Sequence, residues 1–271
     1  MAVDEVLLLS FDPATSPPVL RLYGWEPPAL SLGRFQDAGR DLDLERCRDV
    51  GIPLVRRIPG GGVIYHADEV TYSIVCAPHH LPPSLSITES FRVLTSFLLL
   101  FYSRLGLDAR YAADVCPGQH LGQRTAYCFA GKEACDILIE GKKIGGNAQR
   151  RLRNAIFQHG SIPLRNRAED GGIFMRKQPH GITVTTVSLA EAGIGGDEPE
   201  LKSLLAESFR ATRGVHLQDD RLSCSEEEAV TALLKKYRDD GWNLSGEQPA
   251  HIEGRQTSHP STLQFTGFSL A

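Results

Sequence analysis

Two side chains in the middle of this sequence could together carry out nucleophilic chemistry. Cys128 lies among small residues in the segment TAYCFAG, and Lys143 follows in the segment GKKIGG. An ammonium near a thiol favours the thiolate, which is the form that attacks carbonyl carbon. Cys128 is therefore a candidate nucleophile, and Lys143 is a candidate for its cationic partner. From the residues alone, an inert thiol at 128 stays open, and Cys135 is a second candidate.

A glycine triplet forms a second candidate feature. It follows a basic pair and precedes a histidine; the residues are Arg56, Arg57, Gly60, Gly61, Gly62 and His66. Consecutive glycines let main-chain N–H groups approach a carbonyl or phosphate oxygen where a Cβ would block them. A tight β-turn with exposed arginines explains the same pattern and stays open.

The segment GKKIGGNAQRR, residues 141–151, places lysines beside a run of small residues. A lysine in such a setting can point into a pocket and polarise an acyl carbonyl. Strand alternation puts Lys142 on the face opposite Lys143, which predicts that Lys142 is solvated. A solvated hairpin with two surface lysines is the alternative.

The elements that must position these residues are predicted from hydrophobic patterning. Short apolar or alternating runs separated by Gly and Pro predict strands at 6–11, 19–25, 30–35, 53–58, 63–75 and 154–164. Residues 137–140 and 143–145 are expected to pair as a hairpin about Gly141 and Lys142. The fold class that follows is α+β, with a mixed, largely antiparallel sheet and flanking helices.

Helices are predicted in three places. A capping box of Ser86 and Glu89 precedes the 3.6-residue periodicity of residues 91–101. Two more helices are expected at 200–212 and 226–239, the second opened by Ser225 and Glu228. Residues 243–271 are rich in Gly, Ser, Thr, Pro and Gln, so we expect a domain over 1–242 and a loosely ordered tail.

Composition excludes several classes of function. The 271 residues are 41% hydrophobic with a formal charge of −4, which disfavours a nucleic-acid partner. Six cysteines without CxxC spacing predict reduced thiols, with no zinc site and no disulfide framework. The N-terminal apolar run, 6–9, is too short to export or span, so we expect a cytoplasmic protein without a membrane partner.

Four ordered motifs resemble the lipoate-protein ligase and octanoyltransferase superfamily, whose catalytic domain is related to biotin protein ligase. They are YGWEPPALSLGRFQ from Tyr23, RRIPGGGVIYH from Arg56, GKKIGGNAQR from Gly141 and QHGSIPL from Gln158. The resemblance extends to about Trp242. The run from Cys128 to Lys143 is similar, without a gap, to the cysteine-dependent transferase segment CF-x-A-P-S-x-x-E-x-x-x-x-G-R-K.

The resemblance implies roles for individual residues. Cys128 would carry the acyl-thioester and Lys143 would promote its ionisation. Substrate binding would involve Arg56, Arg57, Gly60, Gly61, Gly62, His66, Gly146, Ala148, Gln149 and His159, although a packing role is also open for His159.

Three positions depart from the family pattern. Gly62 stands where the transferases usually have arginine and the ligases have glycine. Ala67 replaces the aspartate after the motif histidine, for which Asp68 is a candidate substitute, and Asn147 replaces a serine.

The activity that the resemblance implies is octanoyl transfer without a cofactor. Octanoyl would pass from acyl carrier protein through Cys128 to a lysine of a lipoyl domain, such as the glycine-cleavage H protein or a dehydrogenase E2 subunit. The acyl tail would lie in an apolar tunnel between sheet and helix. Basic residues could steer an acidic carrier or form a solvated face; they are Lys142, Arg150, Arg151 and Arg153.

Two other functions are compatible with the sequence. An ATP-dependent lipoate ligase would use the glycine loop and Lys143 to bind an acyl-adenylate, with ATP and Mg²⁺ as its requirements. A non-catalytic acyl-binding module would keep the pocket without turnover.

Overall fold

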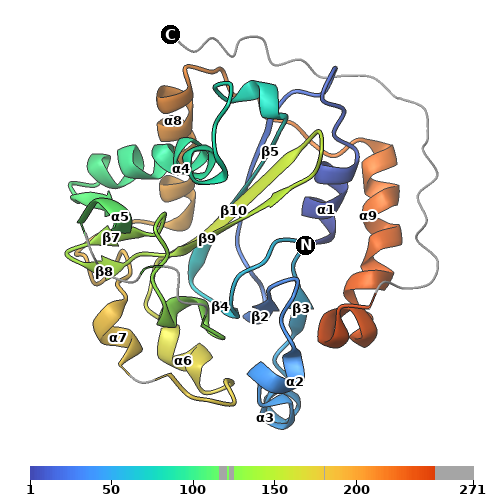
Figure 1. Ribbon diagram of the computed structural model, residues 1–271, viewed down its shortest axis with the longest axis vertical. Helices are drawn as coiled ribbons and strands as arrows, with labels where there is room; N and C mark the ends of the chain where they lie inside the picture. The colour runs from blue at the N-terminus through green and yellow to red at the C-terminus, as the bar shows by residue number, and fades with distance from the viewer. Residues whose placement is uncertain (116–120, 122–124, 180, 248–271) are drawn as a thin grey trace.

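A computed structural model describes residues 1–115, 121, 125–179 and 181–247. Strands and helices are mixed along this chain, and the strands form three sheets within the described residues. Figure 1 shows α4 and α8 on one side of the long strands, and α1 and α9 on the other. The predicted α+β class is confirmed.

The central sheet is antiparallel throughout. Its order is β1 (Val19–Tyr23), β5 (Glu69–Cys76), β10 (Ile156–Pro163) and β9 (Gly146–Arg151). Both β5 and β10 are buried along their whole length. Because side chains alternate along a strand, each of these strands contributes to two buried faces.

One face of the sheet is apolar. Val70, Tyr72 and Ile74 pack there against α4 (Ile87–Arg104) and α8 (Glu198–Arg213). The capping box of Ser86 and Glu89 opens α4 as predicted, because each side chain satisfies a main-chain N–H that the first turn leaves free. This cluster is the largest hydrophobic core of the described chain.

The other face of the sheet carries buried polar groups. Glu69, Thr71 and Ser73 alternate with the apolar residues of β5, and all are buried. The helix α1 (Ala2–Leu9) covers this face, and Asp4 on α1 accepts a hydrogen bond from Ser73 at 2.9 Å. A buried polar face must find its partners within the fold, because water does not reach it.

The strand predicted at 6–11 is wrong, since α1 occupies most of it. A short apolar run fits a buried helix as well as a strand by periodicity alone. Two side chains favour the helix. Asp4 pairs with Arg21 at 2.8 Å, and Glu5 pairs with Lys236 of α9 (Cys224–Tyr237) at 2.7 Å.

The second sheet has the order β3 (Leu54–Arg56), β2 (Ala29–Leu32) and β4 (Ile64–His66). β2 runs parallel to β3 and antiparallel to β4. The short helices α2 (Ala38–Asp41) and α3 (Leu44–Val50), which the sequence pattern did not predict, connect β2 to β3. The glycine triplet links β3 to β4.

The third sheet has the order β6 (Ala109–Tyr111), β7 (Ile137–Ile139) and β8 (Lys142–Lys143). The hairpin β7–β8 is confirmed, but its turn is Glu140–Gly141, one position earlier than predicted. Both turn residues have positive φ, at 49° and 76°, which a two-residue hairpin of this twist requires. The remaining short helices are α5 (Ala112–Val115), η1 (Pro78–His80), η2 (Cys128–Ala130), α6 (Ala168–Gly172) and α7 (Ile182–Thr185).

The C-terminal helices lie close to their predicted positions. α9 begins earlier than expected, because its capping box is Ser223 with Glu226 and not Ser225 with Glu228. After α9, η3 (Gly241–Ser245) places Asn243 in a buried position, where its side chain accepts a hydrogen bond from the Arg56 N–H at 2.9 Å. The domain boundary at 242 stays a prediction, and residues 248–271 of the predicted tail lie outside the described residues.

Candidate active site

Cys128 and Lys143 lie together. Lys143 projects from β8 and is 2% exposed, whereas Lys142 is exposed, as strand alternation predicted. The Lys143 Nζ is 3.9 Å from the Cys128 Sγ. Nζ also donates to the main-chain oxygens of Cys128 at 3.0 Å and Gly131 at 3.1 Å. The loop that carries the thiol is thus tied to the ammonium at two of its carbonyls.

Asp136 is the third member of this cluster, and it was not among the residues predicted from the sequence. Its Oδ2 lies 2.7 Å from the Lys143 Nζ, and both side chains are buried. Burial opposes the charge on Lys143, but Cys128 and Asp136 outweigh it, so the pKa of Lys143 is raised. A signal was available: in the hairpin, Leu138 pairs with Lys143, so Asp136, two residues earlier, projects from the same face.

Two glycines allow the close packing around the thiol. A Cβ at Gly146 would lie 2.9 Å from the Cys128 Sγ, and one at Gly62 would lie 2.8 Å from the Cys128 N. The backbone of Cys128 is paired with the end of the glycine loop, since its N–H donates to the Val63 oxygen at 2.9 Å. The glycine loop, β9 and the cysteine loop therefore meet at Cys128.

The arginine pair is buried and holds loops in place. Arg56 donates to the main-chain oxygens of five residues, which are Gly33, Arg34, Gln36, Trp242 and Leu244. Arg57 donates to the oxygens of Gly60 at 3.0 Å and Gly62 at 2.6 Å, within the glycine loop. Burial lowers the pKa of Arg57 to about 10, which still leaves it charged at neutral pH. The alternative of exposed arginines is therefore wrong.

His66 is buried at the end of β4 and is bound on both ring nitrogens. Its Nε2 lies 2.6 Å from the Ser31 Oγ, and its Nδ1 lies 2.7 Å from the Glu69 Oε1. The carboxylate beside His66 is thus Glu69 and not Asp68, which pairs with Arg167 at 2.7 Å. Asp68 therefore does not substitute for the aspartate that Ala67 replaces, because its carboxylate pairs with Arg167.

The remaining predicted site residues lie on β9 and β10. His159 pairs with Ala148 across these strands and is 4% exposed. Burial, with Arg57 nearby, lowers the pKa of His159 to about 3, so its ring is neutral. Gln149 belongs to the opposite face, where it donates to Gln158 at 3.2 Å and accepts a 3.5 Å contact from Ser90 of α4. Gln149 is therefore not brought beside the thiol.

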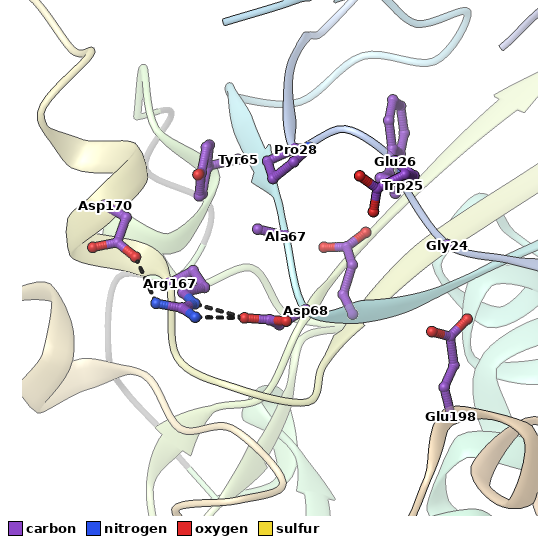
Figure 2. A pocket seen from close by; sticks show the side chains of 11 residues that line it. Gly24, Trp25, Glu26, Pro28, Tyr65, Ala67, Asp68, Arg167, Asp170 and Glu198 are labelled. Carbon is purple, nitrogen blue, oxygen red and sulfur yellow. Dashed lines mark hydrogen bonds and ion pairs between the residues drawn. The ribbon is translucent and has the colours of Figure 1, made fainter. Parts of the chain in front are cut away.

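A polar pocket of about 480 Å³ opens outside the turn between β4 and β5 (Figure 2). Figure 2 shows Arg167 between Asp68 and Asp170 at one end, with Trp25 and Glu198 toward the other. Neither Cys128 nor Lys143 is among its lining residues. We take the cysteine cluster as the chemical centre, because the pocket lining has no comparable pairing of nucleophile and cation.

The first 209 residues match the lipoyl protein ligase A/B catalytic domain. The chain belongs to that family. It is 36% identical over 259 residues to Octanoyltransferase LipM of Kyrpidia tusciae, covering 90% of this chain and 93% of that protein. It is 31% identical over 258 residues to Octanoyltransferase LipM of Bacillus subtilis, covering 90% and 92%.

Solved structures of this lipoyl ligase family share the fold. A lipoate-protein ligase A bound with ATP has a TM-score of 0.74 at 25% identity, covering 90% of this chain and 92% of that one. The putative lipoate protein ligase Ta0514 of T. acidophilum, with bound lipoic acid, has a TM-score of 0.74 at 24% identity and the same coverage.

Two features are absent from the described residues. None of their helices has the length and apolar character to cross a membrane. Their His, Cys, Asp and Glu side chains do not gather in threes in a way that could hold a metal ion.

Proposed function

We propose that this protein is an octanoyltransferase that moves an octanoyl group through a Cys128 thioester to a lysine of a lipoyl domain. The observation that carries the proposal is the 3.9 Å separation of the Cys128 Sγ and the Lys143 Nζ. The names of the relatives, which are octanoyltransferases, indicate that the acyl group is octanoyl. A lysine on a lipoyl domain is the acceptor expected for that chemistry.

In the first step, the Cys128 thiolate attacks the thioester carbonyl of an octanoyl donor. The new S–C bond forms, and the donor's sulfur leaves and takes up a proton. In the second step, the neutral amine of the acceptor lysine attacks octanoyl-Cys128. An amide forms, the amine loses a proton and the Cys128 thiolate is restored, so no nucleotide is consumed.

The charge that develops on the acyl oxygen needs donors. The Cys128 N–H is already bound to the Val63 oxygen, so it is not available. Within the described chain, the N–H groups of Gly61 and Gly62 make no hydrogen bond, and they lie in the loop that packs on the Cys128 backbone. These two N–H groups are the proposed oxyanion donors, each typically contributing a few kcal/mol, and the Lys143 ammonium would contribute its fixed charge.

The proposed donor is an acyl carrier protein, and the proposed acceptors are the H protein or an E2 lipoyl domain. Lys142, Arg151 and Arg153 are exposed beside β8 and β9, and Arg150 is half-buried. Carrier proteins are acidic, so these cations would increase the rate of encounter at low ionic strength.

The deciding experiment compares the wild type with Cys128→Ala, using octanoyl carrier protein and a lipoyl domain without ATP. We expect the wild type to form the amide and to gain one octanoyl group by intact mass when the acceptor is left out. Cys128→Ala should lose both. Cys135→Ala is the matched control and should retain both, because the Cys135 Sγ contacts the Thr88 oxygen at 3.9 Å whereas the Cys128 Sγ contacts the Lys143 Nζ.

Other outcomes would favour the two alternatives. Transfer by Cys128→Ala, or a strict requirement for ATP, would support the ligase, which Gly62 and the ATP-bound neighbour also fit. Carrier binding without adduct or amide would support a non-catalytic module.

A further inference from the structure

We propose that a buried hydrogen-bond chain, Glu69–His66–Ser31–Arg57, positions the glycine loop against Cys128. These are positioning residues, because none of them reaches the thiol except through the loop. The proposal rests on the proposed function only in taking Cys128 as the reacting group.

The chain connects four buried side chains from four segments. The Glu69 Oε1 lies 2.7 Å from the His66 Nδ1, and the His66 Nε2 lies 2.6 Å from the Ser31 Oγ. The Arg57 Nη1 lies 3.1 Å from the same Ser31 Oγ. Each of the four residues is at most 5% exposed. At that burial, water cannot replace a lost partner, so a broken link leaves a polar group unsatisfied.

Only one direction of donation gives every imidazole and hydroxyl proton of the chain an acceptor; within the described residues the buried Arg57 Nε has no partner in either direction. Glu69 accepts hydrogen bonds from the hydroxyls of Thr71 and Ser161, each at 2.5 Å, so it faces His66 as an acceptor. The His66 Nδ1 therefore donates to Glu69. Its Nε2 then accepts from the Ser31 hydroxyl, whose oxygen accepts from Arg57. Reversing the middle link would leave the Ser31 hydroxyl proton without an acceptor and would place a second cation beside Arg57.

Arg57 connects the hydrogen-bond chain to the glycine loop. Nη1 is held by the Ser31 main-chain oxygen at 2.9 Å and by the Ser31 Oγ at 3.1 Å, while Nη2 donates to the oxygens of Gly60 and Gly62. The glycine loop is tightly packed against its neighbours. A Cβ at Gly33 would lie 2.0 Å from the Gly61 oxygen, and Gly62 packs directly on the Cys128 N. Rotation of the guanidinium would therefore move the loop that contacts the nucleophile and carries the proposed oxyanion donors.

An aromatic ring covers the imidazole of His66. Trp25 stacks on His66 with ring centres 4.0 Å apart and an interplanar angle of 12°. Trp25 and Glu69 both line the polar pocket, so Trp25 covers one face of His66 where the chain meets that pocket (Figure 2). Its Nε1 donates to Thr71, which in turn donates to Glu69. This arrangement excludes water from the imidazole.

The test is Ser31→Ala in the full-length enzyme, with Ser208→Ala as matched control. Both serines are 0% exposed and both accept a hydrogen bond from an arginine, but Ser208 lies on α8, away from the site. For Ser31→Ala we expect kcat for octanoyl transfer to fall about tenfold while KM for the donor changes less than about twofold. Amide hydrogen exchange at Val63 and Cys128, whose N–H groups donate to the Ala126 and Val63 oxygens, should become faster. Ser208→Ala should change neither.

Exchange at Val63 and Cys128 that is as slow in Ser31→Ala as in Ser208→Ala would overturn the proposal, whatever happens to kcat. Should Ser31→Ala fail to fold, Glu69→Gln keeps the side-chain volume, removes the charge and is expected to give the same two changes. Retention of transfer by Cys128→Ala would overturn the proposed function instead, and the exchange measurement would still decide whether this chain holds the loop.

Discussion

The ammonium of Lys143 has three protons and three oxygen acceptors, on Cys128, Gly131 and Asp136. The 3.9 Å contact with the Cys128 Sγ is therefore an electrostatic contact more than a fourth hydrogen bond. A lysine that is held this firmly supplies positive charge at a fixed place, and it does not need to reorganise as negative charge develops.

Asp136→Asn should separate charge from geometry at this site. The substitution removes one of the charges that raise the pKa of Lys143, so that pKa should fall. A raised lysine pKa stabilises the fold below the ordinary value of 10.5 and loses its effect as pH rises through the folded-state value. We expect about 3 kcal/mol of destabilisation, with alkaline unfolding beginning at lower pH. Urea unfolding at neutral and alkaline pH measures both, and Asp108→Asn, an exposed paired aspartate, is the control.

Gly146→Ala tests the close approach at the thiol. The new Cβ would lie 2.9 Å from the Cys128 Sγ, so the thiol must move. We expect the rate of octanoyl-Cys128 formation to fall about tenfold, because small misplacements of reacting atoms are costly. Gly195→Ala, where a Cβ has open space, is the control for rapid-quench mass measurements. An unchanged rate in Gly146→Ala would contradict the tight packing of Gly146 against the thiol.

At the scale of elements, the site is built where strand ends and tight connections meet. The hairpin β7–β8 carries Lys143, β9 carries Gly146, and the link from β3 to β4 carries the glycine loop. The polar face of the central sheet is covered by α1, which α9 holds through a buried ion pair. Glu5 accepts from Lys236 at 2.7 and 2.8 Å and from Tyr237 at 2.7 Å.

Glu5→Gln should loosen the attachment of α1 to α9. The ammonium of Lys236 would stay buried without a counter-charge, which typically costs about 3 kcal/mol. The urea midpoint should fall accordingly, with faster hydrogen exchange in α1. Glu198→Gln breaks a partly exposed pair with Lys202 and should change stability by no more than about 0.5 kcal/mol. Equal effects of the two substitutions would show that burial does not increase the contribution of the Glu5–Lys236 pair to the free energy of unfolding.

At the scale of the whole molecule, one sheet serves two purposes. Its apolar face packs on α4 and α8 and supplies the largest described core. Its polar face is equally buried and holds Glu69, Ser73 and His159 beside Asp4 of α1. A buried polar face makes stability depend on pH, because each group folds in one protonation state.

Two histidines predict the sign of this dependence on the acid side. Burial lowers the pKa of His159 to about 3 and that of His80 to about 4, from an ordinary 6.5. Below pH 6.5 the unfolded chain binds these protons and the folded chain does not, so the free energy of unfolding decreases as the pH is lowered. The slope should approach 1.4 kcal/mol per pH unit for each histidine. His159→Gln should remove about half of it in urea titrations between neutral pH and pH 5, and an unchanged slope would contradict the assignment.

Much of the fold and the centre of the site followed from local patterns. Periodicity and capping identified α4, and alternation put Lys143 inside and Lys142 outside, because side-chain direction in a strand or helix is fixed by backbone geometry. The order of the motifs indicated the family. These features depend on neighbouring residues, and the amino-acid sequence alone determined them.

What the tertiary structure decided depends on partners that are distant in the chain. The run at Val6 became a helix because Asp4 and Glu5 find Arg21 and Lys236. Asp136 forms its ion pair with Lys143, and Ser31 forms its hydrogen bonds with His66 and Arg57, only because the fold brings these residues together. A buried polar group is stable only when a complementary group reaches it, and the path of the whole chain determines which group does so.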